Sequence, residues 1–168
     1  MKYWLGLGAN LDDRLAALRA AVDALGARGV TVDAVSHIYE TAPREVAGQP
    51  AFLNAACRVR TDLDPPALLA LIKGIERDLG RVAGPRYGPR AIDVDILLWE
   101  GGEWLDSTIE VPHPRLLERR FALVPLLDLE PDMVLGDTLL VEVEARLDRD
   151  DQPVTRPPGL PLLHAEGG

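Results

Sequence analysis

The fold is decided by residues 30–60, which read VTVDAVSHIYETAPREVAGQPAFLNAACRVR. Two runs of strand-forming residues, 30–39 and 52–60, stand here with only a proline- and glycine-containing loop between them. The second run alternates, so that Leu53 and every second residue after it point to one side. Two consecutive strands without an intervening helix favour antiparallel pairing, and they count against a doubly wound parallel sheet.

Outward from this pair, the chain shows one strand-helix pattern on each side. Residues 2–7 form an apolar strand-like run, and residues 91–100 form another. Between the runs 52–60 and 91–100, Asp64-Pro65 is predicted to begin a helix and Gly80 to end it. The other helix is marked by apolar residues at spacings of three and four: Leu11, Leu15, Leu18, Val22 and Leu25. The order predicts a ferredoxin-like α+β sandwich, βαββαβ, with its helices on one face of a largely antiparallel sheet.

The rest of the chain predicts a C-terminal addition to this sandwich. Gly101-Gly102 is typical of a two-residue hairpin turn, and residues 103–111 contain one or two further strands. Residues 116–129 predict a short helix interrupted by Pro125. We expect one domain over residues 1–148, with an added hairpin and short helices. Residues 149–168 hold several prolines and predict an irregular tail.

Composition narrows the class of protein. The chain has 168 residues and a net charge of −9, and 47% of its residues are hydrophobic. The hydrophobic content is enough for a folded core. The negative net charge argues against a general nucleic-acid-binding protein, which would normally carry a basic surface. The single cysteine, Cys57, suits a reducing compartment, and no apolar run reaches the ~18 residues of a membrane span. We expect a cytoplasmic, single-domain protein that binds no nucleic acid and no membrane.

Two carboxylates share one side of the strand at residues 91–100. Asp93 and Asp95 are two positions apart, so their Cα atoms lie roughly 6.5–7 Å from each other on the same face. Magnesium prefers such oxygen ligands and completes its shell with water and substrate phosphates. The alternative is that this is a solvated strand face. The core-facing side of the strand is predicted to consist of Ile92, Val94, Ile96 and Leu98.

An arginine cluster immediately precedes the acidic pair. Arg81, Arg86 and Arg90 stand among glycines and prolines without an intervening acid. Guanidinium groups beside a metal-binding carboxylate pair are typical of phosphoryl transfer. No P-loop is present, and Gly6-x-Gly8 lacks the third glycine of a dinucleotide-binding motif.

Aromatic and amide side chains predict a site for a flat heterocycle. Phe52 and Asn54 share the non-core side of their strand, where a ring can stack and an amide can bond an edge. Phe121, which follows Arg119 and Arg120, is a second candidate ring, although a core position explains it equally well. His113 lies between two prolines and can donate to a phosphate or serve a structural role.

Residues 86–98, RYGPRAIDVDILL, resemble the signature of the 6-hydroxymethyl-7,8-dihydropterin pyrophosphokinase family. Supporting matches occur over residues 2–145: LGANL at 7–11, TAP at 41–43, QP at 49–50, FLNA at 52–55, IE at 75–76, GR at 80–81 and VPH at 111–113.

The resemblance implies a ferredoxin-like, usually monomeric enzyme of the folate pathway. It implies transfer of the terminal pyrophosphoryl unit of ATP to the pterin hydroxymethyl group, with release of AMP and with two Mg²⁺ ions. It assigns Asp93 and Asp95 to the metals, and to catalysis together with Arg81 and Arg90. The implied pterin contacts are Thr41, Ala42, Pro43, Phe52, Asn54 and Phe121. The implied ATP contacts are Lys73, Glu76, Arg81, Arg86, Arg90, Ile96, His113 and Arg119.

The sequence also predicts two loops that close over the site, and it leaves two other functions open. Residues 40–49 and 82–88 are predicted to close over the substrates and exclude water. A regulatory module that binds a small ligand without turnover would also suit the fold. An RNA-binding sheet that stacks bases on Phe52 is the other alternative, which the net charge opposes.

Overall fold

The computed structural model describes residues 1–11, 13–42, 51–80, 91–161 and 163. Its main sheet has six strands, all paired antiparallel. The elements in chain order are β1 (Lys2–Ala9), α1 (Arg14–Ala27), β2 (Thr31–Val35), β3 (Tyr39–Thr41), β4 (Phe52–Arg60), α2 (Pro65–Leu79), β5 (Asp93–Trp99), β6 (Trp104–Leu105), β7 (Glu110–Val111), the 3₁₀ turn η1 (Leu116–Glu118), α3 (Arg120–Leu129), β8 (Val134–Leu135), β9 (Thr138–Leu139), α4 (Leu140–Arg146) and β10 (Val154–Thr155).

The strand order confirms the ferredoxin-like α+β prediction. β1 and β4 lie at the centre, β5 is the outer neighbour of β1, and β2 and β3 both pair with the far side of β4. β2 and β3 correspond to the single strand predicted over residues 30–39. They are separated at Ser36, whose hydroxyl accepts the Ala56 N–H at 2.8 Å and so replaces a ladder bond.

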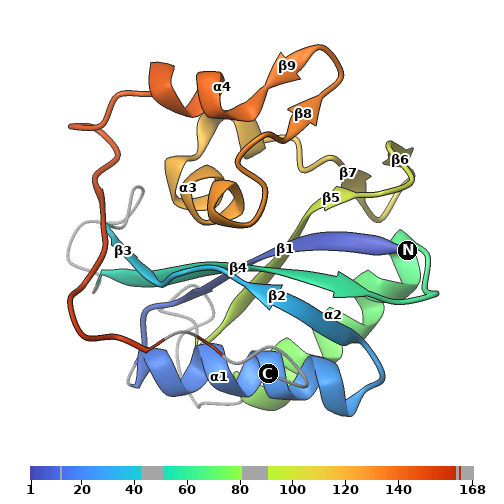
Figure 1. Cartoon of the computed structure of the whole chain (residues 1–168). Helices are drawn as coiled ribbons and strands as arrows, with labels where there is room; N and C mark the ends of the chain where they lie inside the picture. The colour runs from blue at the N-terminus through green and yellow to red at the C-terminus, as the bar shows by residue number, and fades with distance from the viewer. Residues whose placement is uncertain (12, 43–50, 81–90, 162, 164–168) are drawn as a thin grey trace.

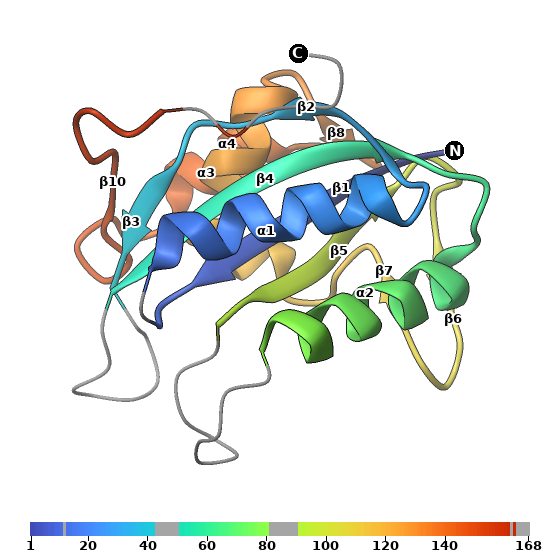
Figure 2. The same cartoon turned by 90° about the horizontal axis from the view of Figure 1, so that it is seen from below.

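Helices α1 and α2 cover one face of the sheet, as Figure 2 shows from below. An aspartate side chain caps the N-terminus of each helix: Asp13 accepts the Ala16 N–H, and Asp64 accepts the Ala67 N–H, both at 3.0 Å. The start predicted at Asp64-Pro65 and the end predicted at Gly80 are confirmed. Within the parts of the chain that the structure describes, no helix has the length and apolar character needed to cross a bilayer.

The two helices of the predicted sandwich thus lie on one face, as expected, and the added C-terminal helices, which the sequence did not place, partly cover the second face (Figure 1). Figure 1 shows α3 on the side of the sheet opposite α1, with α4 beyond it. Carboxylates at the end of α3 hold it there. Asp128 accepts the Tyr39 hydroxyl at 2.8 Å, and Glu130 accepts Arg58 Nη1 at 2.8 Å. Burial, with Asp128 adding to it, raises the pKa of Tyr39 to about 12.

A bulge between β1 and β5 changes which residues of β5 face the main core. Trp4 pairs with Leu98 whereas Leu5 pairs with Ile96, so one residue of β5 is skipped. Leu97 and Leu98 consequently both belong to the cluster under α3. The prediction that Leu98 continues the core-facing series is wrong, because alternation cannot pass through a bulge unchanged.

Three further expectations about the C-terminal half are corrected. Gly101-Gly102 does not form a two-residue hairpin, because β6 pairs with β7 across a loop that the Asp106 carboxylate caps. Pro125 does not interrupt α3, where it is buried against the sheet. The tail expected to be irregular after residue 148 contributes β10, which pairs with β3, so the sheet continues beyond the predicted boundary. The two strands expected within residues 103–111 are β6 and β7, whereas the small hairpin β8–β9 was not predicted.

The reactivity of the Cys57 thiol tests how well the core is closed to solvent. Its side chain is fully buried in β4, and burial, with the charge of Asp33 adding to it, raises the pKa of the thiol to about 12. Because the thiolate is the nucleophile, we expect a disulfide reagent at pH 8 to label the native protein very slowly. In urea, labelling should become fast and reach one thiol per chain. Fast labelling of the folded chain would contradict this packing.

Candidate active site

The two carboxylates of the predicted metal site lie on one face of β5. Asp93 and Asp95 are half-buried, and they alternate with buried residues that face the main core. Directly opposite them on β1 are Gly8 and Gly6, respectively. The predicted juxtaposition is therefore confirmed, and the neighbouring strand carries no side chain at either paired position.

Gly8 separates the acidic pair from a cluster of polar and aromatic groups on β4. In the cross-strand register it lies between Asp93 and Asn54. A Cβ atom at Gly8 would lie 2.9 Å from Asn54 Nδ2 and 3.6 Å from Phe52 Cδ1. A side chain at this position would force the Asn54 amide to move, so glycine keeps the amide in place. β1 therefore carries no side chain of its own between Asp93 and Asn54, which makes this stretch a bare strip, although Gly8 is buried beneath the Asn54 amide.

Asn54 is held in one orientation by Thr41. The Thr41 hydroxyl donates to Asn54 Oδ1 at 2.5 Å, and both residues are only 6% exposed. This bond directs the Asn54 amide nitrogen toward Gly8. Phe52 is the cross-strand neighbour of Thr41. The amide and ring predicted for a flat heterocycle therefore share one end of the sheet with Thr41, which the family resemblance implied as a further contact.

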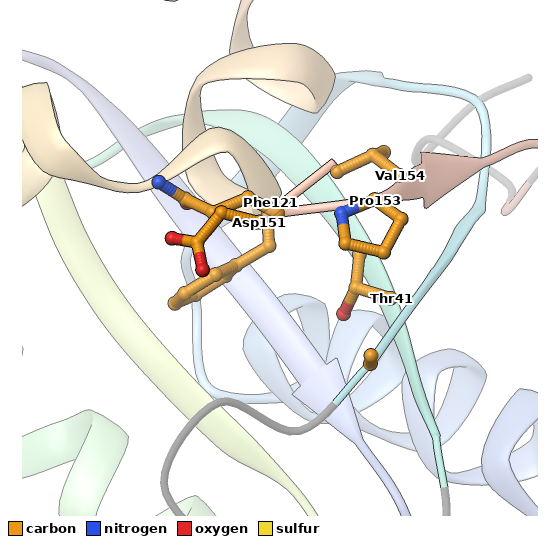
Figure 3. A pocket seen from close by; sticks show the side chains of 7 residues that line it. Thr41, Phe121, Asp151, Pro153 and Val154 are labelled. Atoms are coloured by element: carbon orange, nitrogen blue, oxygen red, sulfur yellow. The ribbon is translucent and has the colours of Figure 1, made fainter. Parts of the chain in front are cut away.

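A pocket of about 170 Å³ opens beside Thr41 (Figure 3). Of the residues that the structure describes, Thr41, Ala42 and Phe121 line it together with residues 151–154. The guanidinium carbon of Arg119 lies 5.3 Å from the centre of the Phe121 ring, within cation–π range. The structure therefore brings three of the predicted pterin contacts to one pocket and places Arg119 against the ring of one of them.

His113 is attached to β5 just beyond Asp95. Its backbone N–H donates to the Leu97 carbonyl at 2.9 Å, and its Nδ1 accepts the Arg115 N–H at 3.1 Å. The neutral ring therefore carries its proton on Nε2. Burial lowers the pKa of His113, with Asp95 opposing this and Arg119 adding to it. His113 is thus placed as a neutral donor near the acidic pair.

Glu76 and Lys73 lie at the outer edge of β5, beside the acidic pair. Glu76 Oε2 accepts the Val94 N–H at 2.9 Å, and Glu76 Oε1 pairs with Lys73 Nζ at 3.0 Å. Because β5 is an edge strand, this carboxylate takes the place of a strand partner. The side chain of Ile96, also predicted to contact ATP, is 5% exposed and packs in the main core. If Ile96 contacts the nucleotide, it does so through its backbone and not its side chain.

We expect Glu76→Ala to destabilise the fold by about 1–2 kcal/mol, because the Val94 N–H loses its acceptor. Glu76→Gln keeps an acceptor oxygen and should recover most of this loss. Lys73→Ala removes only the exposed partner and should cost less than about 0.5 kcal/mol. Urea unfolding measures all three. A Glu76→Ala variant as stable as the wild type would contradict a role at the strand edge.

Some predicted residues lie outside the described residues. These are Pro43, Arg81, Arg86 and Arg90. The same holds for residues 43–49 of the first predicted loop and for the whole of the second, 82–88.

Sequence reasoning missed two parts of the site. It treated Gly6-x-Gly8 only as a failed dinucleotide motif, although glycines two apart in a strand indicate a bare strip on one face. It also assigned nothing to residues 151–154. No local signal could have found these, because a two-residue strand has no measurable periodicity.

The acidic pair fits magnesium by its chemistry. Among the described residues, no cluster of three or more His, Cys, Asp or Glu side chains is suited to a metal. Asp93 and Asp95 therefore form a two-carboxylate set. Mg²⁺ uses one or two carboxylates together with substrate phosphates and water, whereas structural zinc sites require four protein ligands. The pair thus suits a cation that arrives with a nucleotide.

Comparison with known proteins agrees with this geometry. Residues 4–131 match the model of the family described as 7,8-dihydro-6-hydroxymethylpterin-pyrophosphokinase (HPPK). The chain belongs to this family. A pyrophosphokinase of Methylorubrum extorquens is 44% identical over 148 residues, which cover 88% of this chain and 94% of the relative. One of Bacillus subtilis is 44% identical over 127 residues, covering 75% and 76% of the two chains.

A solved structure shows the same fold. A Plasmodium falciparum HPPK-DHPS crystal structure superposes with a TM-score of 0.68 at 15% identity, covering 86% of this chain and 43% of that longer one. As a member of the HPPK family, the chain is an ATP-dependent enzyme of folate biosynthesis that transfers pyrophosphate to hydroxymethyldihydropterin. Family membership decides in favour of this enzyme over the regulatory module and the RNA-binding sheet.

Proposed function

We propose that this HPPK binds its two substrates side by side on the second face of the sheet, with the triphosphate near β5 and the pterin near β3 and β4. The observation that carries this proposal is the row Asp93–Gly8–Asn54 across three adjacent strands. In this row the two carboxylates and the Asn54 amide lie on either side of a strand that adds no side chain between them. This supports the proposal, because two substrates held by these groups would be neighbours and could reach a reacting geometry.

In the proposed reaction the pterin hydroxymethyl oxygen releases its proton to solvent and bonds to the β-phosphorus of ATP. The bond from that phosphorus to the oxygen bridging the α-phosphate breaks, and AMP leaves with this oxygen. Asp93 and Asp95 would hold two Mg²⁺ ions. Bound there, the ions would neutralise triphosphate charge. Arg81 and Arg90 would neutralise the charge that develops during transfer.

The pterin ring would lie between Phe52 and Phe121. Asn54 supports this assignment, because Thr41 holds its amide in one orientation and so makes it a prepared hydrogen-bonding partner. Thr41, Ala42 and Pro43 would contact the edge of the ring. A sandwich between two aromatic rings selects a flat heterocycle, and the amide selects its edge.

The ATP contacts would come from both sides of β5. His113 would donate from Nε2 to a phosphate oxygen, which its neutral tautomer allows. Arg119 lies over Phe121, where its charge can reach a phosphate while its plane packs on the ring. The remaining proposed contacts are Lys73, Glu76, Arg81, Arg86, Arg90 and Ile96. We also propose that the enzyme acts as a cytoplasmic monomer.

The product of ATP cleavage tests the reaction directly. Purified protein mixed with ATP, Mg²⁺ and 6-hydroxymethyl-7,8-dihydropterin should release AMP and form the pterin pyrophosphate, in equal amounts. Omission of the pterin alcohol or chelation of the metal should stop the reaction. Release of ADP would indicate transfer of a single phosphoryl group and would overturn the proposal, as would ligand binding without turnover.

A further inference from the structure

The tail after α4 is built into the substrate pocket. Residues 151–154 line it together with Thr41, Ala42 and Phe121, which come from β3, the residue that follows it, and α3 (Figure 3). In Figure 1 the tail descends from α4 along the side of the molecule and reaches β3. One short segment thus joins the helix layer of the second face to the edge of the sheet.

A buried polar cluster holds the upstream end of this segment. The backbone N–H of Arg120 donates to Gln152 Oε1 at 2.9 Å, and Arg120 Nη1 donates to the Gln152 carbonyl at 2.6 Å. Gln152 Nε2 donates to the Glu118 carbonyl at 3.0 Å, and Arg120 Nε pairs with Glu144 at 2.9 Å. Arg120, Glu144 and Gln152 are each less than 10% exposed. Such a satisfied buried network is rigid, since breaking any bond leaves a desolvated polar group.

Strand pairing holds the downstream end. Val154 pairs with Thr41, and Thr155 pairs with Glu40, as the antiparallel ladder β10–β3. Thr41 is the residue that orients Asn54. Pro153 lies between the two anchors and restricts the backbone further. The segment is therefore fixed at both ends, next to Phe121 on one side and Thr41 on the other.

We propose that residues 151–154 form a specificity-determining wall of the pterin pocket, positioned by the Arg120–Gln152–Glu144 cluster. This inference rests on the proposed placement of the pterin against Phe121 and Thr41. The size of the pocket supports it, because about 170 Å³ is well below the ~300–1,000 Å³ typical of sites for larger ligands. A compact bicyclic ring suits that space, and a whole nucleotide does not. The wall contacts the pterin and leaves ATP binding to other residues.

The decisive variant is Val154→Phe, which puts an aromatic ring into the pocket from the wall. Pterin binding is followed by the intrinsic fluorescence of 6-hydroxymethylpterin in the presence of Mg²⁺ and a non-hydrolysable ATP analogue. We expect the Kd for the pterin to rise by at least about ten-fold, because the added ring occupies the space of the ligand. The Kd for the ATP analogue should stay within about two-fold. Thr155→Ala, the next residue along β10 and not part of the pocket lining, should bind both as the wild type does.

A second variant tests the anchor without filling the pocket. Gln152→Ala removes the side-chain bonds to Arg120 and Glu118, so the pterin Kd should rise while the thermal unfolding curve still shows one cooperative transition. Unchanged pterin affinity in Val154→Phe would overturn the inference, and so would an equal loss of ATP and pterin affinity. Because binding is measured without turnover, these results are independent of AMP release by the wild type, which tests the proposed reaction instead.

Discussion

Asp95→Ala is expected to abolish pyrophosphoryl transfer almost completely while the chain stays folded. Charge stabilisation by a metal site contributes several kcal/mol to such a reaction, and each ~1.4 kcal/mol is a factor of ten in rate, so kcat should fall by at least about 10³-fold. Asp95 is half-buried opposite Gly6, on the strand face that points away from the main core. The free energy of unfolding should change by less than about 0.5 kcal/mol.

The measurement is AMP release at saturating ATP and pterin, with urea unfolding in parallel. Asp62→Ala provides the control, since it removes an equal charge from an exposed position before α2. That variant should retain wild-type turnover. An Asp95→Ala enzyme that kept more than about a tenth of its activity would show that the acidic pair does not hold the reaction's metal.

Gly8→Ala is expected to cost about 10²-fold in kcat/KM for the pterin. The added methyl group would lie 2.9 Å from Asn54 Nδ2, so the amide must move away from the position in which Thr41 holds it. A displacement of about 1 Å in a positioning group is sufficient for a loss of this size. The φ angle of Gly8 is not in the left-handed region, so the effect is one of space and not of backbone strain.

Gly6→Ala makes the same change two residues earlier on the same strand. There the atoms nearest to the new methyl group belong to the Leu97 side chain, at 3.4–3.6 Å, which is ordinary van der Waals contact. Its loss in kcat/KM should be at least about ten times smaller than that of Gly8→Ala. Steady-state kinetics with varied pterin at saturating ATP compare the two. Equal losses in the two variants would contradict the role given to the Asn54 amide, because only Gly8→Ala displaces it.

Much of the fold could be predicted because its signals are local. The alternation of residues 52–60, the cap at Asp64 and the apolar spacing of the first helix each involve residues within a few positions of one another. The same alternation sufficed to put Asp93 and Asp95 on one face. Side-chain direction in a regular strand follows from the backbone alone, with no knowledge of the partner strand.

The rest required contacts between residues far apart in the chain. Gly8 lies between Asp93 and Asn54 only because of the register of three strands, and the bulge beside Trp4 turns Leu98 to the second face. The position of α3 depends on Asp128 meeting Tyr39, 89 residues away.

By itself, the sequence determined the order of strands and helices, the acidic pair and the family. Only the tertiary structure decided that the glycines form a bare strip and that residues 151–154 close the pocket. The physical reason is that the hydrophobic periodicity of a segment reflects which of its faces is buried, and not which distant segment it pairs with. A two-residue strand such as β10 is defined wholly by Thr41 and Glu40, the residues it pairs with.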